Sequence, residues 1–319
     1  MHYPLVSLAM RKVGELVVTL FVASVLIFSL VALVPGDPAA ALAGGTRPNP
    51  ETLAAIRRQF RLDDPIWQRY LGWIGDLFTG NLGTSFVYRA NVTDIIGPRI
   101  GTSLLLVAYS ALIILVVGVG VGVAGALGNR VVDRGLSVLT AIAMGAPTFV
   151  VAIFLISVFA LGLGWFPVFG AGDDFGDQLY HLTLPAIAMS FAYFAFVARI
   201  TRSSVRGEMF SEHVETARSR GLAPRQYIPH HVLRNASAQI FSVAGLTIAS
   251  LFAATVVAEQ AFGINGIGSL LVQSAARQDL PTVQIISLAM VFAFVVVNTV
   301  VDIVNAAIDP RTATRGRTA

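Results

Sequence analysis

The chain has 319 residues, of which 55% are hydrophobic and 13% charged, and its formal net charge is +4. Soluble domains carry roughly 25% charged residues, so this composition and a mean hydropathy of +0.73 exclude an ordinary soluble domain and predict a polytopic membrane protein. The sequence contains no cysteine, which excludes disulfides, thiolate metal sites and cysteine nucleophiles.

The first apolar run covers residues 13–34 and follows Arg11 and Lys12. It is long enough to span a bilayer, which takes about 20 apolar residues. A cleaved signal peptide would have a shorter apolar core and a cleavage site of small residues. We therefore interpret residues 1–35 as a cytoplasmic N-terminus and an uncleaved first transmembrane helix, which the PGDP segment at 35–38 ends.

Residues 36–98 are polar enough to lie in water. Asn49-Pro50 and Asp64-Pro65 are both signals for the start of a helix. Gly80-Asn81 reads as a turn, and the segment after it reads as a short extended piece. We expect a small, mostly helical extracytoplasmic insertion that packs on the rest of the molecule.

Residues 99–319 are expected to form the transmembrane core. Their apolar runs lie at 100–127, 136–162, 184–197, 237–258 and 282–303. The predicted fold is an all-α membrane protein with six transmembrane helices and the insertion between the first and second. Gly145-Ala146-Pro147 interrupts the third run, and a short helix is expected within 259–281 near the surface opposite the basic loop described below.

The second apolar run carries a series of glycines, at positions 118, 120, 122 and 125. Small residues four apart allow helices to approach closely in lipid. Their depth within an apolar run argues against a loop that binds phosphate. We therefore expect them to form a helix-packing face.

Residues 199–236 form a basic stretch with seven arginines between two apolar runs. Such a segment cannot lie in hydrocarbon, so it must emerge into water. Arginine in the short loops concentrates on the side that holds this stretch and both termini, which predicts that all three are cytoplasmic. A solvated basic loop that only sets topology is the simplest interpretation of such a charge run.

The same stretch, called the basic loop below, also has helical order. Ser211 stands where a helix would be capped, with Glu212 next to it, and Pro224 suits the first turn of a second helix. Helical spacing puts a set of small or apolar residues on one face: Phe210, Val214, Ala217 and Gly221. Gly221 stands where a left-handed turn would end the first helix.

The sequence lacks the residues of several chemistries. Lys12 is the only lysine, and Met10-Arg11 before it do not form a glycine-rich phosphate loop, so the chain cannot be an ATPase by that route. It has no HExxH motif, and the adjacent His230 and His231 point in different directions on a helix. We predict no catalytic, cofactor-binding or metal-binding residues and no enzymatic activity.

Coupled transporters usually keep ionisable residues at membrane depth. Here Glu15, Glu259 and Asp302 lie near the expected span ends, and Asn298 is the clearest polar residue inside a span. An interhelical hydrogen bond and a role in a pore both remain open for Asn298. A stand-alone secondary transporter or channel is the main alternative to a subunit driven by another protein, and an intramembrane enzyme or assembly factor is the second.

Glu215-Thr216-Ala217, followed three residues later by Gly221, resembles the Glu-Ala-Ala signature of the permeases of ABC importers. The string at 213–236 looks like the version in the dipeptide/oligopeptide permease family. Weaker likenesses to that family follow in order along the chain, at 35–38, 62–71, 81–86, 164–170, 181–186, 266–268 and 308–311.

The sequence departs from the family pattern at a few positions, namely Thr216, Pro229, Gln239 and Asn265. Thr216 is small, so the helix face should survive, whereas Pro229 should kink the second short helix. These departures leave the class intact but weaken any transfer of substrate from the family.

The resemblance implies a subunit of a bacterial inner-membrane importer. Its partners would be a second homologous permease, two ATPase subunits that bind ATP and Mg²⁺, an extracytoplasmic binding protein and the surrounding lipid, with no nucleic acid. Similar permeases carry dipeptides, oligopeptides, glutathione, haem or nickel complexes, so the resemblance favours peptides without naming one. The helix at 211–221 would dock on an ATPase subunit through residues of the loop: Phe210, His213, Val214, Glu215, Ala217, Arg218, Gly221 and Leu222.

Overall fold

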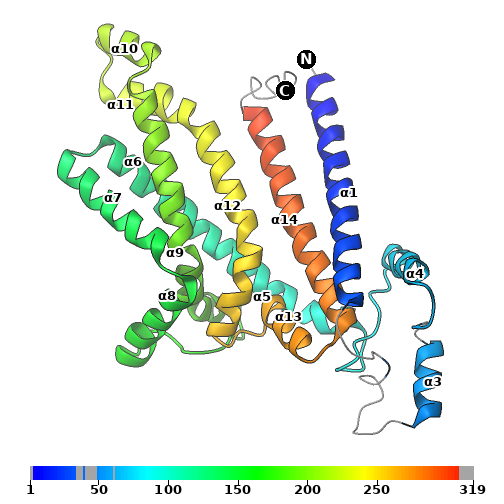
Figure 1. Cartoon of the computed structure of the whole chain (residues 1–319). Coiled ribbons are helices and arrows are strands. Elements are labelled where there is room, and N and C mark those ends of the chain that lie inside the picture. Colours follow the sequence, from blue (N-terminus) through cyan, green and yellow to red (C-terminus); the bar gives the residue numbers. More distant parts are fainter. Residues whose placement is uncertain (1–2, 34–38, 40–48, 60–61, 309–319) are drawn as a thin grey trace.

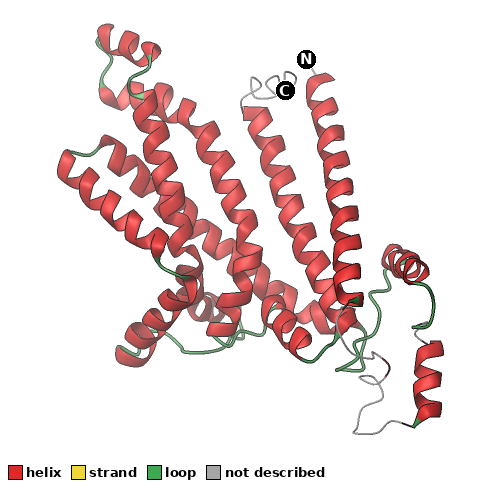
Figure 2. Ribbon diagram, in the orientation of Figure 1, coloured by secondary structure: helices red, strands yellow, loops and turns green. Residues whose placement is uncertain are grey.

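A computed structural model describes residues 3–33, 39, 49–59 and 62–308 of the chain. The described residues are mostly helical and contain no strand, apart from one isolated antiparallel bridge between Thr84 and Asn91 (Figure 2). The expected all-α architecture is therefore confirmed. The predicted break at 35–38 and the match at 308–311 fall wholly or largely outside the described residues.

The helices follow one another with few long loops (Figure 1). In the first half they are α1 (Tyr3–Ala32), α3 (Pro50–Gln59), α4 (Ile66–Phe78), α5 (Val92–Ile113), the π-helical η1 (Ile114–Gly118), α6 (Val119–Leu127), α7 (Arg130–Gly145), α8 (Thr148–Leu155) and the π-helical η2 (Ile156–Gly162). In the second half they are α9 (Phe175–Glu208), α10 (Glu212–Ser219), α11 (Pro224–Tyr227), the π-helical η3 (Ile228–Leu233), α12 (Arg234–Ala261), α13 (Ile267–Ala276) and α14 (Leu280–Ile308).

Among the described residues, five helical segments are long and apolar enough to cross a membrane, or six if a bent pair is one span. The bent pair is α7 with η2 and α8, and its halves meet at an angle of 104°. The break falls at Ala146 and Pro147, because proline cannot continue the hydrogen-bond ladder of the helix before it. The six apolar runs are thus present, and the third is broken at the expected place.

The structure corrects the bounds of three spans. The second span runs from Val92 to Leu127, so it begins before residue 100 and takes in the end of the expected insertion. The fourth runs from Phe175 to Glu208, far beyond the expected 184–197, and the fifth belongs to a continuous segment from Pro224 to Ala261. Arginines near the membrane surface are compatible with a helix, so a change from apolar to basic residues did not mark a helix end.

Helix α9 packs against α5, α6, α7, α8 and α12 and forms the centre of the core. Gly118 and Gly122 let α6 and its preceding π-turn approach α9 closely: a Cβ at Gly122 would lie 2.6 Å from the carbonyl oxygen of Ala198. Gly125 faces Arg202 of the same helix, whereas Gly120 has nothing within 4 Å. The predicted glycine face is therefore confirmed for three of its four members.

The two ends of the bundle carry different elements (Figure 1). The start of α1, the end of α14 and the α10–α11 pair lie at one end, and α3, α4 and α13 lie at the other. The expected helix near the opposite surface is thus α13. The predicted starts of α3 and α4 at Pro50 and Ile66 are also present, and Asn49 Oδ1 accepts the backbone N–H of Glu51 at 3.1 Å.

The loop between α4 and α5 is fastened to the start of α14 by a buried carboxylate. Asp279 is 0% exposed. It accepts hydrogen bonds from Ser85 Oγ at 2.6 Å, from the backbone N–H of Phe86 at 2.9 Å and from Thr282 Oγ1 at 2.8 Å. The conformation there is turn-like instead of the expected extended piece, because the backbone of Phe86 must face inward to reach this carboxylate.

Candidate functional site

The basic loop folds at the end of the bundle that also holds the start of α1 (Figure 1). Ser211 stands at the N-cap position of α10, but its hydroxyl donates to the carbonyl oxygen of Glu208 at 2.6 Å and caps no N–H of α10. Glu212 and Glu215 lie in the first turn, where the helix dipole favours acidic residues. The position of the cap was predicted correctly, and its side-chain bond was not.

A glycine ends α10 in the predicted way. Gly221 has φ +80°, and its N–H donates to the carbonyl oxygen of Arg218 at 2.9 Å. The N–H of Leu222 donates to the carbonyl oxygen of Ala217 at 3.2 Å. Together these two bonds form the Schellman motif, which needs a left-handed residue that glycine adopts without strain.

One face of α10 is packed into the protein. Val214 is 0% exposed and Ala217 4%, and both belong to a buried cluster with residues of the neighbouring helices, namely Val205, Tyr227, Val232, Ala236 and Ile240. Phe210, expected on the same face, is 73% exposed. Val214 and Ala217 therefore hold α10 on the bundle, and the interpretation that they form its outer contact surface is wrong.

Leu222, an apolar residue just after the end of α10, is also open to solvent. Leu222 is 37% exposed. Together with Phe210 it places two exposed apolar side chains at opposite ends of α10, with the exposed Glu215 and Arg218 between them. A surface with apolar ends and a charged middle can bind a partner's groove.

Arg218 and Glu215 do not form the expected local pair among the described contacts. The guanidinium of Arg218 instead lies over the ring of Tyr227, 5.3 Å from its centroid. The side chain of Glu215 makes no hydrogen bond or ion pair within the described part of the chain and is exposed. The carboxylate is thus left available to another molecule.

The second short helix begins at Pro224, as predicted. Pro229 lies in the π-helical turn η3, which joins α11 to α12. A proline lacks an N–H and displaces the helix before it, and the π-turn absorbs this change. His213 of α10 reaches across to this region, with its Nε2 2.8 Å from Asn235 Nδ2 and 3.3 Å from Glu208 Oε2.

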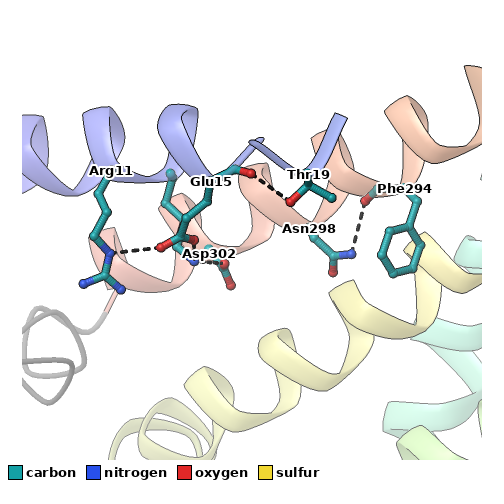
Figure 3. Close-up of polar contacts among 7 residues, drawn as sticks. Arg11, Glu15, Thr19, Phe294, Asn298 and Asp302 are labelled. Carbon is teal, nitrogen blue, oxygen red and sulfur yellow. Dashed lines mark hydrogen bonds and ion pairs between the residues drawn. The ribbon is translucent and has the colours of Figure 1, made fainter. Parts of the chain in front are cut away.

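Charged residues also join α1 to α14 near the same end of the bundle (Figure 3). Lys12 Nζ lies 2.8 Å from Glu15 Oε2 and 2.8 Å from Asp302 Oδ2. Asn298 donates to the carbonyl oxygen of Phe294 in its own helix at 3.2 Å, so the interhelical hydrogen bond, one of the two alternatives left open for it, is absent from its described contacts. The only lysine of the chain therefore serves as a bridge between the first and last spans.

The sequence did not predict that the carboxylate of Glu259, at the opposite end of the bundle, is buried. Glu259 is 0% exposed and accepts hydrogen bonds from Ser103 Oγ at 2.6 Å and from the backbone N–H of Ser269 at 2.9 Å. The N–H of Ile267 donates to Ser103 Oγ at 2.8 Å. Glu259 and Ser103 thus satisfy the free N–H groups at the start of α13.

The Gly-Ile-Gly segment at 266–268 is explained by this carboxylate. A Cβ at Gly266 would overlap the carboxyl group of Glu259, and a Cβ at Gly268 would lie 2.7 Å from the backbone of Val256. In the sequence, the only signal of this arrangement was the pair of glycines that flank Ile267, with Glu259 upstream of them. Within the described part of the chain no three His, Asp or Glu side chains gather as metal ligands would.

A bundle of membrane-spanning helices with an exposed helical loop held on one end defines a multi-span membrane protein. Comparison with known families then identifies it. Residues 5–107 match the N-terminal profile of binding-protein-dependent transport system membrane components, and residues 114–314 match the profile described as binding-protein-dependent transport system inner membrane component. The chain belongs to this family of importer permeases, as the Glu-Ala-Ala signature predicted.

Curated relatives are similar over almost their whole length. The probable peptide ABC transporter permease protein y4tP of Sinorhizobium fredii is 32% identical and aligns over 95% of this chain and 97% of its own. A putative peptide transport system permease protein of Brucella abortus is 34% identical over 96% and 98%. The glutathione transport system permease protein GsiC of Shigella flexneri is 32% identical over 96% and 98%.

Solved structures share the fold at lower identity. An inward-facing structure of the MetNI methionine ABC transporter has a chain that aligns with a TM-score of 0.54 and 16% identity, over 67% of this chain and 96% of its own. This likeness concerns the fold alone. The remaining third of this chain is not aligned with that structure.

Proposed function

We propose that this chain is one permease subunit of an ABC importer for peptides and that α10 couples it to a separate ATPase subunit. Two such permeases would enclose the path, an extracytoplasmic binding protein would deliver the substrate, and ATP and Mg²⁺ would be bound by the ATPase partners. Family membership supports the importer class, and the names of the relatives from Sinorhizobium and Brucella support peptides as substrates.

The proposed coupling role rests on one observation: α10 has one side buried in the bundle and another exposed to solvent. Val214 and Ala217 anchor it to the bundle, so a force on α10 is transmitted to α9 and α12. Phe210, Glu215 and Leu222 face away from that anchor and are free to contact a partner. An amphipathic helix that docks in a groove of its partner is a common mode of recognition.

Mechanically, closure of the ATPase subunits on ATP would move α10, and the helices that pack against it would move with it. Such rocking of one helical unit against another is how alternating access is achieved in transporters. The bend at Ala146 and the π-turns η1, η2 and η3 are irregular points in the helices at which such motion can be absorbed.

The test combines a charge reversal on the exposed face of α10 with a substitution at the glycine that ends this helix. Glu215→Lys and Gly221→Arg should lower transport and substrate-stimulated ATPase activity of the reconstituted importer, while membrane insertion stays normal. Asp76→Lys makes the same change of charge on α4 at the other end of the bundle and should leave coupling intact. Full coupling in both α10 variants would contradict the proposal.

Co-purification separates this proposal from a stand-alone secondary transporter or channel. When the chain is expressed with the products of neighbouring genes, an importer permease should bring ATPase subunits with it. Transport that persists in the purified chain alone, without ATP, would support the alternative. The substrate is best identified from the ligand bound to the cognate binding protein.

A further inference from the structure

A cavity of about 210 Å³ lies between α6, α7 and α9. These three helices pack together at the side of the bundle away from α1 (Figure 1). The wall is largely apolar, with Val121, Leu136, Ala141 and Met144 among its residues. Two arginines and two hydroxyls complete it: Arg199, Arg202, Ser137 and Thr140.

The positive charge at this cavity is only partly compensated. Arg202 forms an ion pair with Asp133 of α7 through its Nε, and its Nη2 lies 2.7 Å from Asp133 Oδ2. Arg206 Nη1 also contacts this carboxylate at 3.0 Å. The side chain of Arg199 makes no hydrogen bond or ion pair in the described part of the chain and is exposed. Arg202 and Arg206 thus share one carboxylate, and the side chain of Arg199, which also lines the cavity, has none among the described residues.

The hydroxyls add further free hydrogen-bonding capacity. Thr140 Oγ1 donates to the carbonyl oxygen of Ser137 at 3.1 Å, while the hydroxyl of Ser137 has no hydrogen bond within the described residues. Ser137 and Arg199 therefore present an O–H and a guanidinium to the same cavity. This is the donor set that suits a phosphate oxygen.

We propose that this cavity binds an anionic phospholipid. The phosphate would contact Arg199 and Ser137, and an acyl chain would lie along Leu136, Ala141 and Met144. Helix α7 begins at Arg130 on the side of the bundle that holds the basic loop, since Asp133 in its first turn contacts Arg206 near the end of α9. The lining residues farthest along α7, Ala141 and Met144, are apolar. Basic pockets between transmembrane helices are suited to anionic head groups.

A free phosphate would use the cationic part of the cavity and leave its apolar wall empty. A lipid uses both, which is why we favour the lipid as occupant. The second permease subunit is a third possible cover for this face, and it would exclude lipid. The site is separate from α10, so its failure in the following experiment would leave the proposed coupling role untouched.

The experiment is native mass spectrometry of the complete importer complex, purified in detergent and equilibrated with equal amounts of phosphatidylglycerol and phosphatidylcholine of the same acyl chains. The wild type should retain phosphatidylglycerol preferentially. Arg199→Gln should reduce this retention by roughly five-fold, the ratio for one basic residue at about 1 kcal/mol, and Arg199→Lys should restore most of it. Arg134→Gln, an exposed arginine of α7 outside the cavity, is the matched control.

Four outcomes would overturn the proposal. Equal retention by the wild type and Arg199→Gln, or equal loss in Arg199→Gln and Arg134→Gln, would remove Arg199 as a specific contact. Absence of retained lipid from the wild type would mean that another subunit covers the face. Complete displacement of the lipid by inorganic phosphate would reduce the site to an anion site, whereas lipid that resists phosphate supports a role for the apolar wall.

Discussion

The carboxyl group of Glu259 fills the space that a side chain at Gly266 would need. The two residues lie on opposite sides of the turn between α12 and α13, and the carboxylate reaches the N–H of Ser269 at 2.9 Å. This contact holds the short helix α13 against the end of α12. Close packing explains why residue 266 is a glycine. Its backbone φ of −107° does not, because any residue can adopt that angle.

Gly266→Ala should therefore destabilise the protein by about 1–3 kcal/mol, the usual cost of overpacking a buried site. The added methyl group must displace a carboxylate that has two hydrogen bonds to lose. Thermal unfolding of the detergent-solubilised protein measures the effect. Gly120→Ala is the matched control because nothing lies within 4 Å of its Cβ position, and equal midpoints for the two variants would contradict the packing argument.

Replacing Asp279 by alanine should loosen the loop that precedes α5. The change leaves Ser85 Oγ, the N–H of Phe86 and Thr282 Oγ1 without their acceptor. A buried donor without a partner costs about 1–3 kcal/mol. Arg89 lies in this loop with φ +52°, so trypsin should cut after it faster in Asp279→Ala than in the wild type.

The control for that measurement is Asp94→Ala, which removes an exposed carboxylate from the first turn of α5. The loss of stability in Asp94→Ala should stay within the roughly 0.3–1 kcal/mol typical of a helix-dipole interaction, about a third of the loss expected for Asp279→Ala. Cleavage at Arg89 that is no faster in Asp279→Ala than in Asp94→Ala would rule out the anchoring role.

On α10, Val214→Ala and Phe210→Ala should separate packing from partner contact. Val214 is 0% exposed, and removal of two buried carbon groups costs roughly 2 kcal/mol. Phe210, at 73% exposed, should change stability little but weaken ATPase coupling. Scanning calorimetry and ATPase assays on the same preparations give both readouts, and a destabilised Phe210→Ala protein would show that its ring is packed after all.

The topology predicted from the arginines can be tested with reporters. A reporter fused near residue 220 should give a cytoplasmic signal, and one near residue 75 an extracytoplasmic signal. The structure puts α10 and α4 at opposite ends of the bundle, which makes the two fusions an internal control for each other (Figure 1). A cytoplasmic signal from the fusion near residue 75 would reverse the orientation.

Local features were predictable because they depend on neighbours in the chain. The starts of α3 and α11 at proline, the left-handed Gly221 and the break before Pro147 all come from backbone restrictions of single residues. Span ends were less predictable. The fourth span extends through three arginines to Glu208, since a helix can leave the membrane without ending.

By itself, the sequence determined that the protein crosses the membrane repeatedly, that its fold is helical and that it carries the Glu-Ala-Ala signature of importer permeases. These follow from composition, apolar run length and local spacing. Tertiary structure alone decided that Val214 and Ala217 face inward and that Glu259 caps α13 through Ser103, a residue 156 positions away. The physical reason is that burial and capping between distant segments depend on how helices pack, and no local pattern records that packing.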